Sequence, residues 1–317
     1  TGELEHPWAL AFLPDGDMLI TERPGRLRLV EEGRLREEPV AGLPEIYAQD
    51  QGGLLDVALD PAFADNQLVY LSYSHEAEDG TTTTRVMRAR FSPDGLADPE
   101  VIFEAKPLID SSKHFGSRLA FGRDGTLFIT MGDRYSEREE AQNLGSHLGK
   151  VLRINPDGTI PADNPDPASP VWSFGHRNIQ GLAWDSAGRL WATEFGSNQW
   201  DELNLIEPGA NYGWPEVEGR AAQAGFVDPQ IQWSTDEASP SGLAFFDGAL
   251  WVASLRGERL WQIPIAPDGG LGAPVALFVE EYGRLRTVVA TPAGALWFTT
   301  SNRDGRGSPE QGDDRIL

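Results

Sequence analysis

Hydrophobic and polar positions follow the same pattern six times along this chain. Each copy is a short apolar run, a polar turn that usually contains glycine, and a second apolar run; the copies occupy residues 9–20, 55–71, 118–129, 181–191, 242–251 and 288–297. The runs are rich in β-branched and aromatic residues and are bounded by Gly, Pro, Asp or Asn, which is typical of strands joined by hairpin turns. The second copy has Asp65 and Asn66 in place of the glycine turn and is the weakest.

Successive copies lie roughly 45 to 63 residues apart, close to one propeller blade plus loop insertions. The sequence therefore predicts an all-β fold, a six-bladed β-propeller of four-stranded antiparallel sheets that spans residues 1–317 as a single domain. The alternatives are a β-solenoid, which repeats at roughly 20 to 30 residues, and a β-sandwich, which gives no reason for the pattern to recur. The pattern also predicts a third strand of the first blade at residues 27–30 and a short helix within the acidic stretch 135–149. Residues 313–317 resemble the start of a strand, so we expect the natural chain to continue beyond them.

Composition narrows the range of partners. The net charge is −23, from 49 acidic and 26 basic residues, which argues against nucleic acid because phosphate binding needs a basic surface. An acidic chain of this kind has either a well-solvated surface or carboxylates gathered for a divalent metal. There is no cysteine, which excludes disulfides, thiolate metal sites and a cysteine nucleophile. No apolar run approaches the ~20 residues of a membrane helix.

Candidate chemistry lies at the ends of the repeated strands, where propeller loops gather at one mouth of the channel. His114 directly precedes the inner strand of the third copy, and Asp133 follows the next strand of the same hairpin. Because paired strands bring these two ends together, a His–carboxylate contact is expected, in which the carboxylate fixes the imidazole tautomer. A histidine held in this way is a candidate general base near neutral pH. A surface or capping histidine is the alternative.

A second group of polar residues occupies equivalent loop ends in the other copies: Gln51, Arg177, Asn178, Arg256, Arg284 and Arg286. Alternation along an extended segment places Arg284 and Arg286 on one side. Each alone is an ordinary loop side chain. Together they predict a ring of arginines and amides at one channel mouth, which suits a small ligand with several carboxylates.

Residues 194–215 form a third polar region, rich in carboxylates, amides and glycine. Oxygen ligands on a flexible loop suit calcium. On spacing alone, an ordinary polar loop between blades is the better explanation of the stretch.

Several of these segments together resemble the glucose/sorbosone dehydrogenase family of soluble sugar dehydrogenases that use pyrroloquinoline quinone (PQQ), in particular its aldose sugar dehydrogenase branch. The resemblance covers essentially the whole chain, and its strongest stretches are PWALAFLPDG (7–16), QGGLLDVALDP (51–61), HFGSRL (114–119), GKVLRINPDG (149–158), GHRN (175–178), ELN (202–204) and NYGWP (211–215). The family fold is a six-bladed propeller.

The resemblance implies roles for individual residues. His114 would take the proton of the anomeric hydroxyl of an aldose, with Asp133 as its acidic partner, while a hydride passes from the sugar C1 to the C5 carbonyl carbon of PQQ and the lactone forms. Arg177 would stabilise charge on the reacting carbonyl oxygen, and calcium would polarise that carbonyl.

The remaining implied residues bind the cofactor and the metal. The quinone would be held by Gln51, Asn178, Trp233, Thr235, Arg256, Arg284 and Arg286. Calcium would be held by main-chain oxygens of Gly196 and Ser197, in a network that includes Asp201, Glu202 and the main chain of Tyr212. Gln142, in a shortened third-blade loop, would line the pocket.

The chain departs from the family pattern at a few positions. Ile179 and Ser197 stand where proline is frequent, and Lys113 stands beside His114 where Asn or Asp is frequent. A cation close to His114 would lower the pKa of the imidazole.

The expected partners are a sugar substrate and an unidentified electron acceptor, in a monomer or homodimer that is periplasmic or secreted. Two other functions remain open: a calcium-dependent propeller hydrolase of lactones or esters, and a sugar-binding propeller without catalysis.

Overall fold

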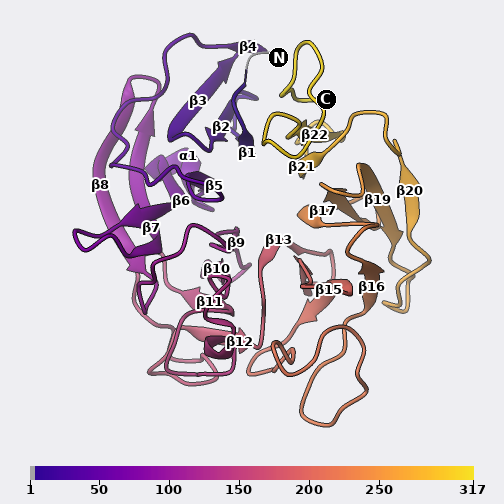
Figure 1. Ribbon diagram of the computed structural model, residues 1–317. Helices are drawn as coiled ribbons and strands as arrows, with labels where there is room; N and C mark the ends of the chain where they lie inside the picture. The colour runs from indigo at the N-terminus through magenta and orange to yellow at the C-terminus, as the bar shows by residue number, and fades with distance from the viewer. Residues whose placement is uncertain (1–3) are drawn as a thin grey trace.

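The computed structural model describes residues 4–317, and nearly all of its regular structure is β-strand (Figure 1). The first blade contains β1 (Pro7–Phe12), β2 (Met18–Glu22), β3 (Arg26–Glu31) and β4 (Arg34–Leu35). The second contains β5 (Leu54–Leu59), β6 (Leu68–Glu76), β7 (Thr82–Ser92) and β8 (Gly95–Glu104), with the one-turn helix α1 (Phe63–Asn66) between its first two strands.

The next three blades repeat this arrangement. The third contains β9 (Leu119–Phe121), β10 (Leu127–Met131), β11 (Lys150–Ile154) and β12 (Val171–Phe174). The fourth contains β13 (Ile179–Trp184), β14 (Leu190–Glu194), β15 (Trp200–Ile206) and β16 (Ile231–Ser234). The fifth contains β17 (Pro240–Phe246), β18 (Ala249–Ser254), β19 (Arg259–Pro264) and β20 (Val275–Leu277).

The predicted number of six four-stranded blades was wrong: the structure has five four-stranded blades. The sixth repeat forms a sheet of two strands, β21 (Leu285–Ala290) and β22 (Leu296–Thr300), between the fifth and first blades. After β22 the chain turns through residues 301–314, and only its last residues return as backbone partners of β22, with Ile316 bridged to Thr299. The repeat pattern located the six hairpins, but it carried no information on whether outer strands followed the last one.

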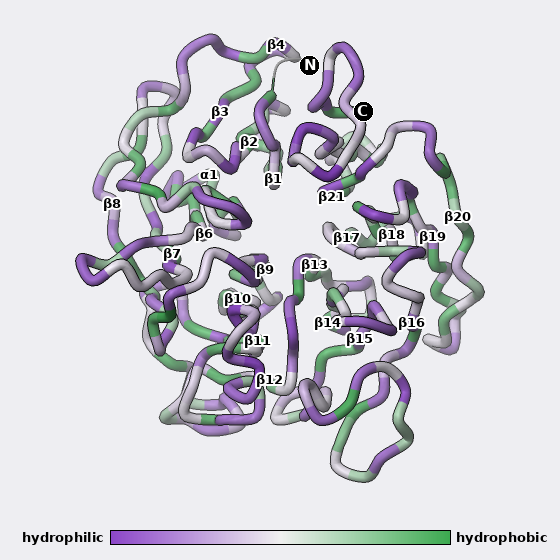
Figure 2. Tube along the Cα trace, viewed as in Figure 1, coloured by the Kyte–Doolittle hydropathy of each residue, from purple (hydrophilic) through white to green (hydrophobic). Residues whose placement is uncertain are grey.

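The hydrophobic core is divided among the contacts between neighbouring sheets. One cluster joins the first two blades through residues such as Leu19 and Leu71, and another joins the two-stranded sheet to the first blade through Val289 and Leu10. Figure 2 shows hydrophobic and hydrophilic residues following one another in short stretches around the whole ring. Because each sheet buries both faces against neighbours, the first strand of every sheet is fixed around a common axis, with β1, β5, β9, β13, β17 and β21 nearest the centre (Figure 1).

The predicted third strand at residues 27–30 lies within β3. In place of a short α-helix, the stretch 135–149 contains a single 3₁₀ turn, η1 (Arg138–Ala141). Among residues 4–317, no helix is long and apolar enough to cross a membrane.

Candidate functional site

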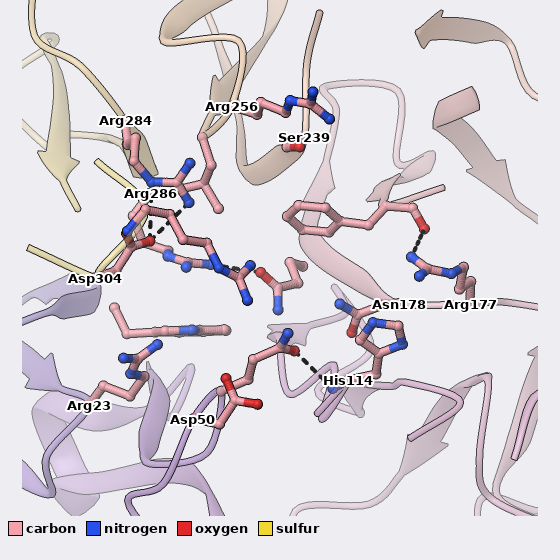
Figure 3. A pocket seen from close by; sticks show the side chains of 16 residues that line it. Arg23, Asp50, His114, Arg177, Asn178, Ser239, Arg256, Arg284, Arg286 and Asp304 are labelled. Atoms are coloured by element: carbon pink, nitrogen blue, oxygen red, sulfur yellow. Dashed lines mark hydrogen bonds and ion pairs between the residues drawn. The ribbon is translucent and has the colours of Figure 1, made fainter. Parts of the chain in front are cut away.

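A cavity of about 500 Å³ is lined by residues that lie in each of the six sheets or a few residues before or after one of its strands, and Figure 3 shows their side chains. Its lining is predominantly polar and cationic, with six arginines and two aspartates. The lining residues are Trp8, Arg23, Asp50, Gln51, His114, Arg177, Asn178, Gln180, Phe195, Ser239, Leu255, Arg256, Arg284, Arg286, Asp304 and Arg306. Against a chain with a net charge of −23, this concentration of arginine makes the cavity a local site for anions.

His114 and Asp133 form a buried pair at one side of this cavity. Nδ1 of His114 lies 2.6 Å from Oδ1 of Asp133, and the two residues are 6% and 1% exposed. Asp133 lies behind the imidazole and does not itself line the cavity. A carboxylate at Nδ1 favours the tautomer that carries its proton there, which leaves Nε2 as the basic nitrogen.

The backbone around His114 is held in an unusual conformation. Its φ angle is +49°, in the left-handed region that non-glycine residues rarely adopt. The His114 amide donates to Oε1 of Gln51 at 2.9 Å, and the Gly116 amide donates to Oδ1 of Asn178 at 3.2 Å. Gly132 is required opposite, because a Cβ there would lie 2.0 Å from the His114 carbonyl oxygen. Gln51 and Asn178 therefore position His114 as well as line the cavity.

The environment of His114 favours the neutral imidazole. Burial lowers the pKa of His114 below its ordinary value, its partner Asp133 raises it in part, and the cations Arg177 and Lys113 lower it further. The Lys113 effect was anticipated from the sequence. A neutral imidazole is the form that accepts a proton.

Arg284 and Arg286 reach the cavity from β21 and the residue before it. The Arg284 guanidinium pairs with Asp304, with Nη2 2.9 Å from Oδ2. Arg286 donates from Nη1 to Oε1 of Gln180 at 2.7 Å, and burial, together with the neighbouring charge of Arg23, lowers its pKa to about 9. A cation that is short of counter-charge in a buried wall favours an anionic ligand.

Arg256 lies at a more open part of the same wall. Its guanidinium pairs with Asp236, and both side chains are largely exposed. Such an exposed pair contributes little energy, so Arg256 is available to a ligand at modest cost.

Two residues predicted to bind the cofactor, Trp233 and Thr235, are not among those that line the cavity, and their contact with a cofactor stays a prediction. Trp233 is buried in β16, the outermost strand of its blade, where its ring lies 5.8 Å from that of Trp261. Thr235 directly follows this strand.

Arg177 and the loop 195–201 form the side of the cavity opposite the arginines of β21. Arg177 Nη1 donates to the carbonyl oxygens of Phe195 at 3.1 Å and Gly196 at 2.5 Å. These carbonyls therefore already attract a cationic group.

The conformation of that loop is fixed by two carboxylates. One oxygen of Glu218 accepts hydrogen bonds from four successive amides, residues 197–200. Asp201 accepts from the amides of Gly196 at 2.8 Å and Ser239 at 2.6 Å, and burial raises its pKa to about 6. Both carboxylate oxygens of Asp201 are thus used to hold the loop. Ser197 belongs to the same loop and is held through its backbone amide, which donates to Glu218.

Glu202 and Tyr212 line a separate small cavity together with Glu194 and Glu218. Burial and the charge of Glu194 raise the pKa of Glu202. Within residues 4–317, no three His, Cys, Asp or Glu side chains are grouped as a metal site. Any cation held here would depend on main-chain oxygens in addition to these carboxylates.

Gln142 does not line the central cavity. Its side-chain amide pairs reciprocally with that of Asn211, at 2.7 and 3.0 Å, and its Nε2 also donates to the Trp214 carbonyl at 2.7 Å. Gln142 therefore connects η1 to the loop that carries Trp214.

Sequence reasoning missed several cavity residues, chiefly Arg23, Asp50, Asp304 and Arg306. A positional signal for three of them was present. Arg23 follows β2 as Asp133 follows β10, and Asp304 and Arg306 follow β22. Applying the rule used for Asp133 to every hairpin would have identified these three.

Comparison with known proteins agrees with this architecture. The family model for "Glucose / Sorbosone dehydrogenase" matches residues 4–308. Aldose sugar dehydrogenase YliI of Escherichia coli is 36% identical, covering 96% of this chain and 89% of that protein. The PQQ-bound structure of an aldose sugar dehydrogenase from Streptomyces coelicolor superposes with a TM-score of 0.93 at 44% identity, covering 100% of this chain and 94% of that one. The apo-form of the soluble E. coli enzyme gives 0.88 at 34% identity, covering 95% and 94%.

The fold and site define a β-propeller with an arginine-lined axial cavity. The chain belongs to the glucose/sorbosone dehydrogenase family. The resemblance inferred from the sequence is confirmed, and so is its enzyme class, an oxidoreductase.

Proposed function

We propose that this protein oxidises aldose sugars at C1 to the lactone, using PQQ as the bound electron acceptor. The buried His114–Asp133 pair beside an arginine-lined cavity carries the proposal. It is supported by the similarity to an aldose sugar dehydrogenase whose structure contains PQQ.

The cavity fits a polycarboxylate cofactor. Six arginines against two aspartates leave an excess of positive charge, and about 500 Å³ accommodates a compact aromatic molecule. Arg284, Arg286 and Arg256 would bind carboxylates, because a guanidinium matches a carboxylate in a bidentate manner. Gln51 and Asn178 would hold the cofactor through the amide nitrogens that their bonds to the His114 loop leave free.

The loop carbonyls beside Arg177 fit calcium, on the condition that Arg177 gives up a hydrogen bond to them. The carbonyl oxygens of Phe195 and Gly196 are hard donors of the kind calcium prefers, and they already accept from a guanidinium. We infer that Arg177 releases Gly196 when calcium binds there and then contacts the cofactor. The neighbouring Glu202 and the main chain of Tyr212 would form a second part of the calcium network.

His114 is the proposed general base. Nε2 would accept the proton of the sugar O1 hydroxyl while the C1 hydrogen leaves as a hydride, so that the C1–O1 bond becomes the lactone carbonyl. Asp133 would stabilise the imidazolium that forms. When bound, PQQ supplies the two-electron acceptor and calcium polarises its reacting carbonyl.

The first test combines the cofactor-free protein with PQQ, calcium, glucose and an artificial dye acceptor. Dye reduction that requires both additions, and that His114→Gln abolishes, supports the proposal. Failure to bind PQQ at micromolar concentration would refute it. Binding without turnover would retain the cofactor and require a scan of other aldoses.

The remaining parts of the proposal are a periplasmic or secreted location, an electron acceptor still to be identified, and a monomeric or homodimeric state. Cell fractionation checks the first, and light scattering of the purified protein checks the last.

A further inference from the structure

Trp214 lies at the meeting point of three parts of the site. It belongs to the loop between β15 and β16, and its main chain is held by the Gly175 carbonyl and by Gln142. Its indole Nε1 donates to Oδ2 of Asp133 at 2.9 Å. The face of its ring lies 5.5 Å from the guanidinium carbon of Arg177.

The two oxygens of Asp133 have different partners. Oδ1 accepts from the Tyr135 amide at 2.8 Å and contacts Nδ1 of His114 at 2.6 Å. Oδ2 accepts from Trp214. Among residues 4–317, Trp214 is the side chain that fixes Oδ2, and so the rotation of the carboxylate about its Cβ–Cγ bond.

We propose that Trp214 is a positioning residue for proton abstraction: its indole N–H locks the Asp133 carboxylate so that Oδ1 stays directed at Nδ1 of His114. The inference rests on the proposed function, since it assigns His114 as the base. The sequence placed this tryptophan in the NYGWP stretch (211–215) but gave its side chain no role.

The hydrogen bond from Trp214 changes how the negative charge is shared between the two carboxylate oxygens of Asp133. A hydrogen bond to Oδ2 stabilises the ionised carboxylate and draws charge away from Oδ1. Without it, Oδ1 would attract the His114 proton more strongly, so the imidazolium would persist to higher pH. The other groups facing His114, namely Arg177, Lys113 and Tyr135, are unchanged by this bond.

The variant Trp214→Phe removes the N–H and keeps an aromatic ring under Arg177. In the cofactor-free protein, we expect the His114 ring signals in NMR to titrate at higher pH than in the parent. In the PQQ-loaded protein, we expect kcat to fall about tenfold, with the acidic limb of kcat/KM moved to higher pH. KM and PQQ affinity should change less than about twofold, because the indole N–H donates to Asp133 and Trp214 does not line the central cavity.

Trp184→Phe is the matched control. Trp184 Nε1 is also buried but has no hydrogen-bond partner among the described residues. Its replacement should leave the His114 titration and kcat unchanged. Combining Trp214→Phe with Asp133→Asn completes a double-mutant cycle, in which the tryptophan change should have no further effect on His114.

An unchanged His114 titration in Trp214→Phe would overturn the inference, as would a loss of PQQ affinity equal to the loss of kcat. If Trp214→Phe does not fold, the indole N–H signal of the parent decides instead. That signal should shift as His114 titrates and cease to do so in Asp133→Asn; a signal insensitive to both would overturn the inference. The NMR readout needs no PQQ, so failure of the proposed function would remain distinguishable.

Discussion

Nδ1 of His114 lies 2.6 Å from Oδ1 of Asp133, and neither residue is more than 6% exposed. This contact joins residues 19 positions apart in sequence, brought together by the β9–β10 hairpin. It sets the tautomer of the imidazole and directs Nε2 to the cavity side.

Replacing the base should separate cofactor binding from turnover. We expect His114→Gln to bind PQQ nearly as well as the parent, because the arginines that hold carboxylates are untouched. Turnover should fall by about 10²–10⁴-fold. Dye-reduction kinetics measure the second quantity and fluorescence titration with PQQ the first. His75→Gln, a half-buried histidine on the second blade, is the control. Turnover within about tenfold of the parent would exclude His114 as the base.

Removing the charge of Asp133 should alter the pH dependence as well as the rate. Burial lowers the pKa of His114 and Asp133 raises it in part. Since the base acts in its neutral form, the acidic limb of kcat/KM should lie below the ordinary histidine pKa of about 6.5. Asp133→Asn should move this limb to still lower pH and reduce kcat by about 10²-fold or more, because the tautomer is no longer fixed. An acidic limb of kcat/KM that moves to higher pH in Asp133→Asn would contradict the inferred effect of Asp133 on the pKa of His114.

The charged residues that line the cavity predict opposite effects on PQQ binding when Arg286 and Asp304 are replaced. Arg286→Gln removes a buried cation and should weaken PQQ binding by about 10- to 100-fold. Asp304→Asn removes the carboxylate that pairs with Arg284. This variant should strengthen PQQ binding by a few-fold, because the Arg284 guanidinium becomes available to the ligand. Isothermal titration at two salt concentrations measures both. Arg138→Gln, an exposed arginine on η1, should change neither. Equal weakening by both variants would indicate a general loss of cavity shape.

The position of Arg177 predicts competition with calcium. Its guanidinium donates hydrogen bonds to the carbonyl oxygens of Phe195 and Gly196, the oxygens proposed to bind calcium. We expect Arg177→Met to bind calcium more tightly without PQQ, by about threefold to tenfold, because the carbonyls are released and a nearby positive charge is removed. The same variant should lose turnover once loaded, because charge on the reacting oxygen is no longer stabilised. Weaker calcium binding in Arg177→Met would refute the competition.

The sequence predicted the residues of this site better than it predicted the number of strands. Repeated apolar runs located all six hairpins, and the loop ends beside them included His114, Arg284 and Arg286, because a hairpin brings its two ends together whatever the rest of the blade does. The outer strands are less regular: β4 has two residues and β20 has three. Beyond β22 the sequence offered residues 313–317, which resemble the start of a strand and of which Ile316 is bridged to Thr299, but it did not show whether two outer strands complete the sheet.

Two tryptophans were hard to place from the sequence, for different reasons. Trp233 belongs to an outer strand, where alternation indicates a buried face but not which neighbour buries it. Trp214 was given no role because its contact with Asp133 joins residues 81 positions apart that belong to different blades. Only the closure of the ring determines contacts of that kind.

Lys150 offers a test of how η1 and the loop that follows it are held. Its ammonium group is fully buried and donates to the carbonyl oxygens of residues 140, 141 and 148 at 2.6–3.0 Å. Burial lowers the pKa of Lys150 to about 7.

Between about pH 7 and the unfolded value near 10.4, the unfolded chain therefore binds more protons than the folded one, and the free energy of unfolding should rise with pH. Relative to Lys150→Met, the parent should gain up to about 5 kcal/mol across that window. Urea unfolding of both proteins at several pH values measures the difference, with the exposed Lys106→Met as control. A difference independent of pH would mean that the three carbonyls keep Lys150 charged despite its burial.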